Sequence, residues 1–378
     1  MLPVAIVGGG PVGLALALAL RHAGIGCEVL DARPAGAPRD DRRVLALSHG
    51  SRQILERLGA WAAIGATPIS TIHVSQQGRF GRTLIEAGEA GVPALGYVAE
   101  AGRVATELAH SCAAAGVAIR HQTQVRDSDA AADRVRLLCA APQGTTDIAA
   151  QLIAWAEGAV GAERDVVRRD YGQQAIVASV QAHGSPAGVA YERFTSSGPV
   201  ALLPLGDRHA LVWTVPYAAA AALLMIEERA FLSCLREAFS GRLEFNAAGK
   251  RSAFPLGLRF RETPVGARAV WLGNAAQTLH PVAGQGFNLA LRDVMQLARL
   301  LQESPSDCGN PELLSRHAAA RQLDRRGAIG FTDGLVRLFG LRGAISGHAR
   351  GAGLLALDLL PTARRFLARR MMYGARGW

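Results

Sequence analysis

The sequence predicts an α/β fold: a Rossmann-like dinucleotide-binding domain assembled from separated segments, an inserted domain built on an antiparallel sheet, and a helical C-terminal tail. Three observations predict it. A strand, a glycine-rich turn and a helix open the chain, and the same order of elements returns near residue 270. Between them, at about 171–216, short apolar runs are separated by glycine and proline, as in antiparallel sheets.

The opening segment has the pattern of a βαβ unit. Residues 3–7 are an apolar run that ends at three consecutive glycines, which predicts a buried parallel strand. Residues 13–23 are rich in leucine and alanine and predict a helix. Residues 27–30 predict a second strand, which ends at Asp31.

The later elements follow from the same periodicities. Helices are expected over 51–58, 104–115, 218–239 and 288–301, and in the tail. Strands are expected over 117–120, 175–180, 200–205, 210–215 and 269–272, with a loop over 281–286. We therefore assign residues 1–70, 95–170 and 265–310 to the dinucleotide-binding domain, 71–94 and 171–264 to the substrate domain, and 311–378 to the helical basic tail.

Composition and charge exclude several classes of protein. Hydrophobic residues make up 49% of the chain and charged residues 19%, which excludes disorder as the main state. The formal net charge is +10, but the part after residue 312 contains twelve arginines against three aspartates. The body is therefore nearly neutral, and we expect no nucleic-acid partner.

The cysteines and the hydropathy pattern bear on location. The five cysteines contain no CxxC pair, which argues against a zinc site or a disulfide framework and favours a reducing compartment. No uninterrupted apolar run is long enough to span a membrane. We therefore expect a cytoplasmic protein without a metal site.

The first motif is a GxGxxG turn placed directly between a strand and a helix. Gly8 allows the tight turn, Gly10 lets the backbone approach a pyrophosphate, and Gly13 lets the helix pack closely on the sheet. Pro11 and Val12 open the helix, whose N-terminal N–H groups and dipole favour phosphate. The motif therefore predicts a dinucleotide site.

Asp31 ends the second strand, where a carboxylate can bind the hydroxyl groups of the adenosine ribose. An acid at this position argues against a 2′-phosphate there. The sequence therefore favours FAD or NAD as the dinucleotide.

A second glycine-rich constellation lies far along the chain. Gly273 and Asn274 follow a short strand, and the segment 280–288 leads into a helix. A second loop at a helix N-terminus suits a cofactor extended across the domain, because N–H groups there stabilise the negative charge of a reduced flavin. The alternative, an ordinary glycine-rich turn that caps a helix, stays open on this motif alone.

Several segments together resemble the class A flavoprotein aromatic hydroxylases. These are GGGPVG with Asp31, AEG at 156–158, and GNAAQTLHPVAGQGFNLALRDV at 273–294. Within that class the chain is most similar to the ubiquinone-biosynthesis hydroxylases that act on polyprenyl phenols, with further likeness at 43–48, 171–175 and 193–205. The resemblance runs from residue 3 to about residue 370.

The resemblance implies a set of cofactor-binding residues. The ADP half of FAD would be held by Gly8, Gly10, Pro11, Val12, Gly13 and Asp31, with Arg43 and Arg103 from neighbouring segments. The motif associated with FAD and pyridine-nucleotide contacts matches Glu157 and Gly158, and the position that contacts the ribityl chain matches Asn274 after Gly273. The residues that would line the isoalloxazine are Pro281, Gly284, Gln285, Gly286, Phe287 and Asn288.

The chain departs from the family pattern at four positions. Glu157 and Asn274 stand where Asp is common, Gly161 stands where serine is usual, and Gln277 stands where many members have His. The changes at Glu157 and Gly161 bear on the handling of NAD(P)H more than on FAD binding. They keep open the alternative of a catalytically weakened FAD-binding assembly protein, and a second alternative on the same fold is an FAD-dependent reductase of polyprenyl chains.

The resemblance also implies a reaction. FAD would be reduced by NAD(P)H, a transient co-substrate, and would hydroxylate a polyprenyl 6-methoxyphenol with O2 through a flavin C4a-hydroperoxide. The sequence shows no nucleophile–base pair, so no catalytic residue is assigned. His280, which precedes a proline in the second loop, is interpreted as a packing or backbone-positioning residue.

The C-terminal tail combines apolar and basic residues. The apolar run at 354–360 precedes four arginines interleaved with Phe366, Leu367 and two methionines. Such a helix can lie on anionic headgroups at the inner face of the membrane, bind a partner protein, or pack on the body with a solvated arginine face. The sequence leaves these alternatives open. We expect the tail to help present a phenol that carries a lipid tail.

Overall fold

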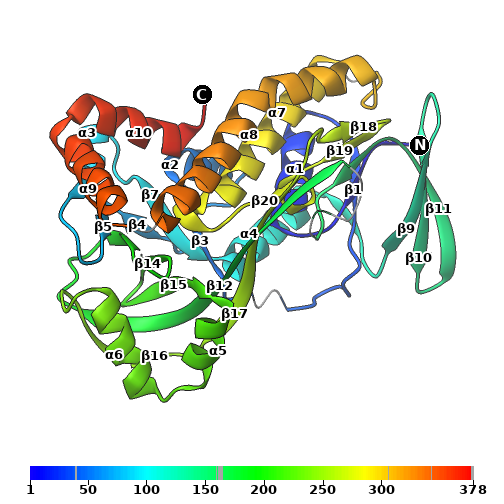
Figure 1. Cartoon of the computed structure of the whole chain (residues 1–378). Coiled ribbons are helices and arrows are strands. Elements are labelled where there is room, and N and C mark those ends of the chain that lie inside the picture. Colours follow the sequence, from blue (N-terminus) through cyan, green and yellow to red (C-terminus); the bar gives the residue numbers. More distant parts are fainter. Residues whose placement is uncertain (39–40, 159, 161–164, 305, 342, 376–378) are drawn as a thin grey trace.

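The computed structural model describes residues 1–38, 41–158, 160, 165–304, 306–341 and 343–375 (Figure 1). Gly161, one of the departures from the family pattern, lies outside these residues. The described elements form three sheets with helices packed around them, and the last three helices cross back over the molecule.

The first sheet has a parallel centre. Its strands are ordered β18–β19–β11–β1–β2–β8, and the pairs from β19 to β8 are parallel. A meander extends it, because β10 pairs antiparallel with β11 and β9 with β10. The bounds are β1 (Leu2–Val7), β2 (Cys27–Leu30), β8 (Ala118–Arg120), β9 (Gln124–Ala130), β10 (Val135–Ala141), β11 (Gly144–Trp155), β18 (Val265–Gly266) and β19 (Ala269–Trp271). The strands predicted over 3–7, 27–30, 117–120 and 269–272 are confirmed within one residue.

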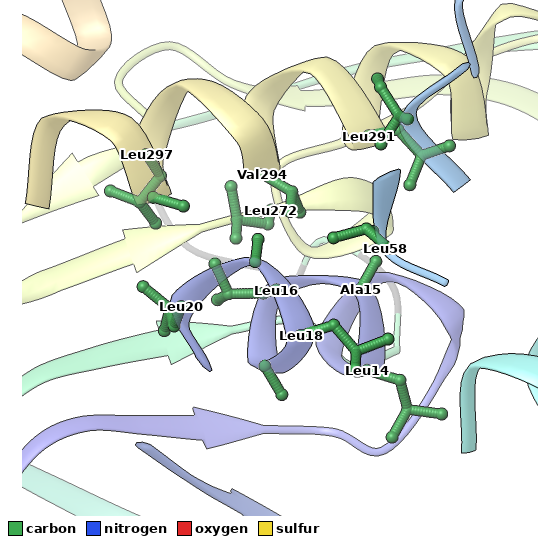
Figure 2. Packing of buried hydrophobic residues seen from close by; sticks show 14 of the residues in the cluster. Leu14, Ala15, Leu16, Leu18, Leu20, Leu58, Leu272, Leu291, Val294 and Leu297 are labelled. Carbon is green, nitrogen blue, oxygen red and sulfur yellow. The ribbon is translucent and has the colours of Figure 1, made fainter. Parts of the chain in front are cut away.

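Helix α1 (Pro11–His22) is the centre of the largest hydrophobic core. Every residue from Gly13 to Leu20 is buried, because α1 packs on β1 and β2 and is covered by α4 (Ala101–Ala114) and α7 (Gln285–Glu303). Figure 2 shows leucines of α1 facing Val294 and Leu297 of α7. Each fully buried leucine contributes roughly 1.5–3 kcal/mol, so this packing holds the glycine turn that precedes α1 in place.

The second sheet is antiparallel except for one pair. Its order is β20–β17–β12–β15–β14–β13–β5–β6, with β16 beside β12, and β13 and β5 are parallel. The bounds are β5 (Thr71–Gln76), β6 (Arg82–Glu86), β12 (Val166–His183), β13 (Val189–Phe194), β14 (Pro199–Leu205), β15 (Arg208–Pro216), β16 (Glu244–Ala248), β17 (Ser252–Arg261) and β20 (Gln277–Thr278). One face packs against α5 (Tyr217–Met225) and α6 (Glu228–Ala238) in a core of its own.

A small third sheet is formed by strands that alternate in sequence with strands of the other two sheets. It consists of β3 (Val44–Ser48), β7 (Gly96–Glu100) and β4 (Thr67–Ile69), all antiparallel. Helix α2 (His49–Arg57) continues directly from β3, and the Ser48 hydroxyl accepts a hydrogen bond from the Ser51 N–H as its N-terminal cap. Helix α3 (Ala87–Ala90) follows β6.

The C-terminal helices pack on the body. Helix α8 (Pro311–Gly340) contacts α7, α9 (Ala344–Leu359) contacts β6, and α10 (Pro361–Tyr373) contacts α2 and α9. Asn310 caps α8, since its side chain accepts from the N–H groups of Glu312 and Leu313. Packing on the body, one of the alternatives left open for the tail, is therefore what the described helices do.

Buried ion pairs join α8 to α7. Arg292 Nε lies 2.7 Å from Asp324 Oδ2, and Arg321 Nε lies 2.6 Å from Asp293 Oδ1. Burial opposes ionisation of Asp324, but Arg292 and Arg321 together hold the pKa of its carboxyl below the usual range. The charged pairs therefore fix how α8 lies along α7.

The single helix expected over 218–239 is wrong. Ile226 and Glu227 have extended backbone, so α5 ends at Met225 and α6 begins at Glu228. Arg251, distant in sequence, donates hydrogen bonds to the carbonyl groups of Leu223 (2.8 Å) and Ile226 (2.7 Å). These bonds satisfy carbonyl groups at the C-terminal end of α5. Because Arg251 lies outside the segment 218–239, the hydrophobic pattern of that segment does not predict the break.

Two other regions differ from expectation. The loop expected over 281–286 is shorter, because α7 begins at Gln285 after a single 3-10 turn, η2 (Val282–Gly284). The meander β9–β10–β11 was not predicted at all, although β11 is the strand that pairs with both β1 and β19.

The packing of α1 gives a test of the core. Leu16 is fully buried, so Leu16→Ala should lower the free energy of unfolding by about 2–5 kcal/mol. Leu323→Ala, at an exposed position of α8, should change it by less than about 0.5 kcal/mol. Urea denaturation of both variants measures the difference, and equal stability of the two would contradict the assigned packing.

Candidate active site

The first glycine turn, Gly8 to Gly13, packs closely against the rest of the protein on one of its sides. Gly8 has φ +108°, and a Cβ there would lie 2.7 Å from Cβ of Glu157. A Cβ on Gly13 would lie 2.0 Å from the carbonyl oxygen of Gly8. Neither position tolerates a side chain, which is the requirement that the motif predicts.

The same turn is open on its other side. A Cβ on Gly10 would meet nothing within 4 Å, and no side chain caps the N-terminus of α1 at this residue. The first-turn N–H groups of α1, at Val12 and Gly13, therefore have no capping side chain. An open cradle at a helix N-terminus fits the pyrophosphate of a dinucleotide.

Two carboxylates flank this turn. Asp31 is buried, and a Cβ on Gly9 would lie 2.3 Å from its Oδ2. Glu157 follows β11 and packs on Gly8. Burial first, and the charge of Asp31 second, raise the pKa of Glu157. Gly158 follows with φ +63°.

Arg33 is a residue of this cluster that the sequence analysis did not single out. Its Nε and Nη2 donate to the two carboxylate oxygens of Asp31 at 3.1 and 2.9 Å, and Nη2 also donates to the carbonyl oxygen of Gly9 at 2.7 Å. The fork holds Asp31 against the glycine turn and places a positive charge there. The sequence signal that could have identified Arg33 is its position two residues after Asp31, directly after a strand.

The second glycine-rich segment, which begins at Gly273, contacts the first glycine turn at the start of α1. Gly273 has φ +57°, and a Cβ there would lie 2.9 Å from Val12 Cγ2. It begins the 3-10 turn η1 (Gly273–Ala275), in which the side chain of Asn274 is exposed. The structure thus brings Gly273 next to the glycine turn, although the two lie far apart in sequence.

The loop before α7 packs on β3. Gly284 has φ +58°, and a Cβ there would lie 2.9 Å from Cβ of Ala46. Asn288 Oδ1 accepts from the Ser48 N–H at 2.8 Å and the Ser51 hydroxyl at 2.7 Å. Its Nδ2 donates to the carbonyls of Ala46 and Gly284. The Asn288 side chain therefore positions the loop, and a direct contact of Asn288 with a cofactor stays a prediction.

The remaining predicted residues of this loop lie at its edges. A Cβ on Gly286 would meet nothing within 4 Å, and no side chain caps the N-terminus of α7 at Gly284. Phe287 packs against the main core, and Gln285 Nε2 donates to the carbonyl of Met371 at 3.4 Å. Pro281 lines the cavity described below.

Arg43 and Arg103, the two arginines predicted to contact the cofactor, both interact with other residues of the protein. Arg43 lies before β3 and pairs with Asp41 at 2.5 Å, and a hydrogen bond from Arg43 lowers the pKa of Asp41. Arg103 Nη2 lies 3.4 Å from the carbonyl oxygen of Ala63. Contacts of either arginine with a cofactor stay a prediction.

His280 is buried before the loop. Its Nδ1 accepts from the N–H of Val282 at 3.1 Å, and its ring meets Tyr171 edge-on with centroids 5.6 Å apart. Burial lowers the pKa of His280 to about 4, so the imidazole is neutral near pH 7. These contacts favour the interpretation of His280 as a positioning residue.

A large apolar cavity opens beside this loop. Its volume is about 670 Å³, and it lies between the face of the second sheet opposite α5 and α6, the loop before α7, and helices α8 to α10. Its walls include Ile72, Leu203, Phe331, Leu357 and Met372. Glu192 and Arg350 are the charged side chains among the described residues that line it. Neither was singled out from the sequence.

The sequence and the fold are similar to those of several known proteins. The sequence model of the FAD-binding domain family matches residues 1–330. Ubiquinone hydroxylase UbiL of Rhodospirillum rubrum is 33% identical, over 98% of this chain and 89% of that protein. The 3-demethoxyubiquinol 3-hydroxylase of Escherichia coli is 32% identical, over 80% of each. The crystal structure of p-nitrophenol 4-monooxygenase PnpA from Pseudomonas putida DLL-E4 has a TM-score of 0.80 at 17% identity, covering 100% of this chain and 99% of that one, and shows the fold.

The open face of Gly10 gives a test of the cradle. An aspartate there fits the protein but places a negative charge where a pyrophosphate would lie, so Gly10→Asp should weaken FAD binding at least about tenfold. Gly88→Asp, at another position with no neighbour within 4 Å, is the matched control. Titration of the apoproteins with FAD, followed by flavin fluorescence, checks this. Equal affinity of the two variants would place the pyrophosphate elsewhere.

Proposed function

Because the chain belongs to the FAD-binding domain family and is an FAD-dependent aromatic hydroxylase, we propose that it hydroxylates the ring of a polyprenyl 6-methoxyphenol in ubiquinone biosynthesis, with O2 and NAD(P)H as co-substrates. The names of its relatives support the substrate class. The apolar cavity is the observation that carries the proposal for this chain. An electron-rich ring with a hydrocarbon tail suits walls of this kind.

The residues present fit FAD. The turn from Gly8 to Gly13 would bind the pyrophosphate, and Asp31 would bind the ribose. The turn at Gly273 and the loop at 281–286 would hold the isoalloxazine end, since they contact the start of α1 and line the cavity, respectively. When bound, FAD would accept hydride from NAD(P)H and would supply the chemistry that transfers one oxygen atom from O2 to the ring.

The walls of the cavity would orient the ring and exclude water. The substrate-facing sheet presents Ala190, Ala201 and Leu203, and the helices opposite present Leu335 and Leu357. Such walls leave little that could hold ordered water beside the reacting ring. Binding energy from a hydrocarbon tail, about 0.8 kcal/mol for each buried CH2, would hold the ring in place.

The rim of the cavity suggests how a lipid-tailed substrate enters. Leu338 and Leu341 both line the cavity and are 47% and 56% exposed. The segment formed by α9 and α10, which also lines the cavity, exposes further large apolar side chains, namely Ile345, Leu355, Leu359, Leu360 and Phe366. The helices described include none that is long and apolar enough to cross a bilayer. We propose that this rim rests on the membrane surface and admits the prenyl tail.

Incubation with labelled O2 tests the reaction. The holoenzyme, NAD(P)H and a short-chain 6-methoxyphenol should yield a product that carries one labelled oxygen atom, detected by mass spectrometry. A product that gains two hydrogens and no oxygen would identify the polyprenyl reductase instead. FAD binding with no product and no substrate-stimulated NAD(P)H oxidation would identify the assembly protein.

Vesicle flotation tests the rim. The protein should float with anionic phospholipid vesicles, and a triple variant (Ile345→Ser, Leu359→Ser, Phe366→Ser) should lose most of this binding, since each change removes an exposed apolar side chain. Met225→Ser, at an 86% exposed residue of α5, is the control and should bind as the parent does. Substitutions are preferable to deletion of the tail, because α9 and α10 form part of the cavity wall. Undiminished flotation of the triple variant would remove the rim from the proposal.

A further inference from the structure

Glu192 stands in the apolar wall of the cavity. It lies in β13, and its register partners Val74 in β5 and Ala201 in β14 also line the cavity. Phe194, two residues along and so on the same face of the strand, stacks on Phe339 of α8 with ring centroids 3.4 Å apart. The carboxylate therefore enters a space walled by hydrocarbon and aromatic groups.

No protein group accounts for a carboxylate here. Among the described residues, none donates a hydrogen bond to Glu192 and no cation pairs with it. Burial alone raises the pKa of Glu192 to about 7. Glu192 is partly buried, because its side chain faces the cavity. A carboxylate held without a partner against apolar walls costs stability, so a structural role does not explain Glu192.

Few other charged or titratable groups lie near it. Arg350 is the other charged side chain of the described cavity lining, and its Nη1 already donates to the carbonyls of Leu338 and Leu341. Tyr191, the neighbour in β13, places its ring 5.5 Å from that of His73.

Three arginines lie on the far side of the sheet from Glu192. Arg193 is buried there and donates to the carbonyl of Ala238 at 2.7 Å and to the Ser75 hydroxyl at 3.0 Å. Arg82 and Arg242 line a separate pocket with Arg193. The strand backbone lies between these arginines and the apolar cavity.

We propose that Glu192 is the base that removes the proton from the phenol hydroxyl of the substrate. The O–H bond breaks, the proton passes to a carboxylate oxygen of Glu192, and the electron pair remains on the phenolate oxygen. The ring thereby gains the electron density that attack on an electrophilic oxygen requires. This inference rests on the proposed function, and it gives the reaction a catalytic residue that the sequence analysis did not assign.

The position and the acidity of Glu192 suit that task. A general base works best when its pKa lies near the working pH, and burial brings this carboxyl there. His280 is a poor rival, because it is not among the residues that line the cavity and its Nδ1 already accepts from Val282. Its pKa of about 4 also makes it a weak base.

Glu192→Gln tests the proposal, with Glu244→Gln as the control. Glu244 lies in the same sheet but is exposed and pairs with Arg236. At pH 7, hydroxylation of a short-chain 6-methoxyphenol by Glu192→Gln should fall at least about tenfold, and the rate should recover toward alkaline pH as the free phenol ionises by itself. Reduction of the flavin by NAD(P)H should be unchanged in both variants.

Two readouts separate this proposal from the proposed function. If the parent makes hydroxylated product and Glu192→Gln keeps the same rate and pH profile, Glu192 is not the base and the proposed function stands. If the parent makes no hydroxylated product at any pH, the proposed function fails and the base assignment fails with it. A loss of product with an unchanged pH profile would also overturn the assignment, since it would reflect altered packing.

Thermal stability supplies a readout that does not depend on turnover. The folded-state pKa of Glu192, about 7, lies above the unfolded value of about 4.3. The protonated carboxyl therefore stabilises the fold at low pH. This contribution to stability declines as pH rises above about 4.3 and is absent well above about pH 7. Glu192→Gln cannot ionise and should therefore melt at a higher temperature than the parent at pH 8, with a smaller gap at pH 5. A lower melting temperature at both pH values would indicate a structural role and contradict the proposal.

Discussion

The close approach of two glycine turns at the start of α1 is the constraint on which the site depends. Gly8 and Gly13 leave no room for side chains between the turn, β11 and the first turn of α1, and Gly273 brings a distant segment against Val12. The buried leucines of α1 hold this arrangement from within. A side chain at Gly8 or Gly13 would displace neighbouring atoms of the protein itself, whereas one at Gly10 would enter only the open face of the turn.

The C-terminal helices pack on the body and form part of the wall of the apolar cavity. The pair Arg292–Asp324 and the bonds of Arg321 fix α8 on α7, the helix that begins at the second loop. From there α8, α9 and α10 supply one wall of the cavity. The same segment that carries much of the positive charge of the chain thus lines the cavity proposed for the substrate and exposes apolar side chains on its outer surface. A membrane role and a packing role are compatible in this arrangement.

The sequence predicted the parts of the site whose signals are local. The GxGxxG turn, its strand and its helix follow from spacing within about 30 residues, and the structure confirms those elements. The break between α5 and α6 could not be predicted, because Arg251 satisfies it from outside the segment. Glu192 was missed for a similar reason: which face of β13 points into the cavity depends on pairing with β5 and β14.

The candidate cofactor site and the cavity proposed for the substrate differ in what forms them. Backbone turns with little room for side chains form the first, whereas side chains of the second sheet and of the last three helices line the second. The segment from Pro281 to Asn288 lies between the two sites. Asn288 makes two hydrogen bonds to β3, one to the Ser51 hydroxyl in α2 and one to the carbonyl of Gly284 within the segment. Changes in Asn288 should thus shift the ring position relative to the cofactor, whereas changes in the helices should alter which tail is accepted. The carboxylate of Glu192 has no partner in the cavity wall and therefore costs stability. Such a cost is expected where a side chain is kept for the reaction rather than for packing.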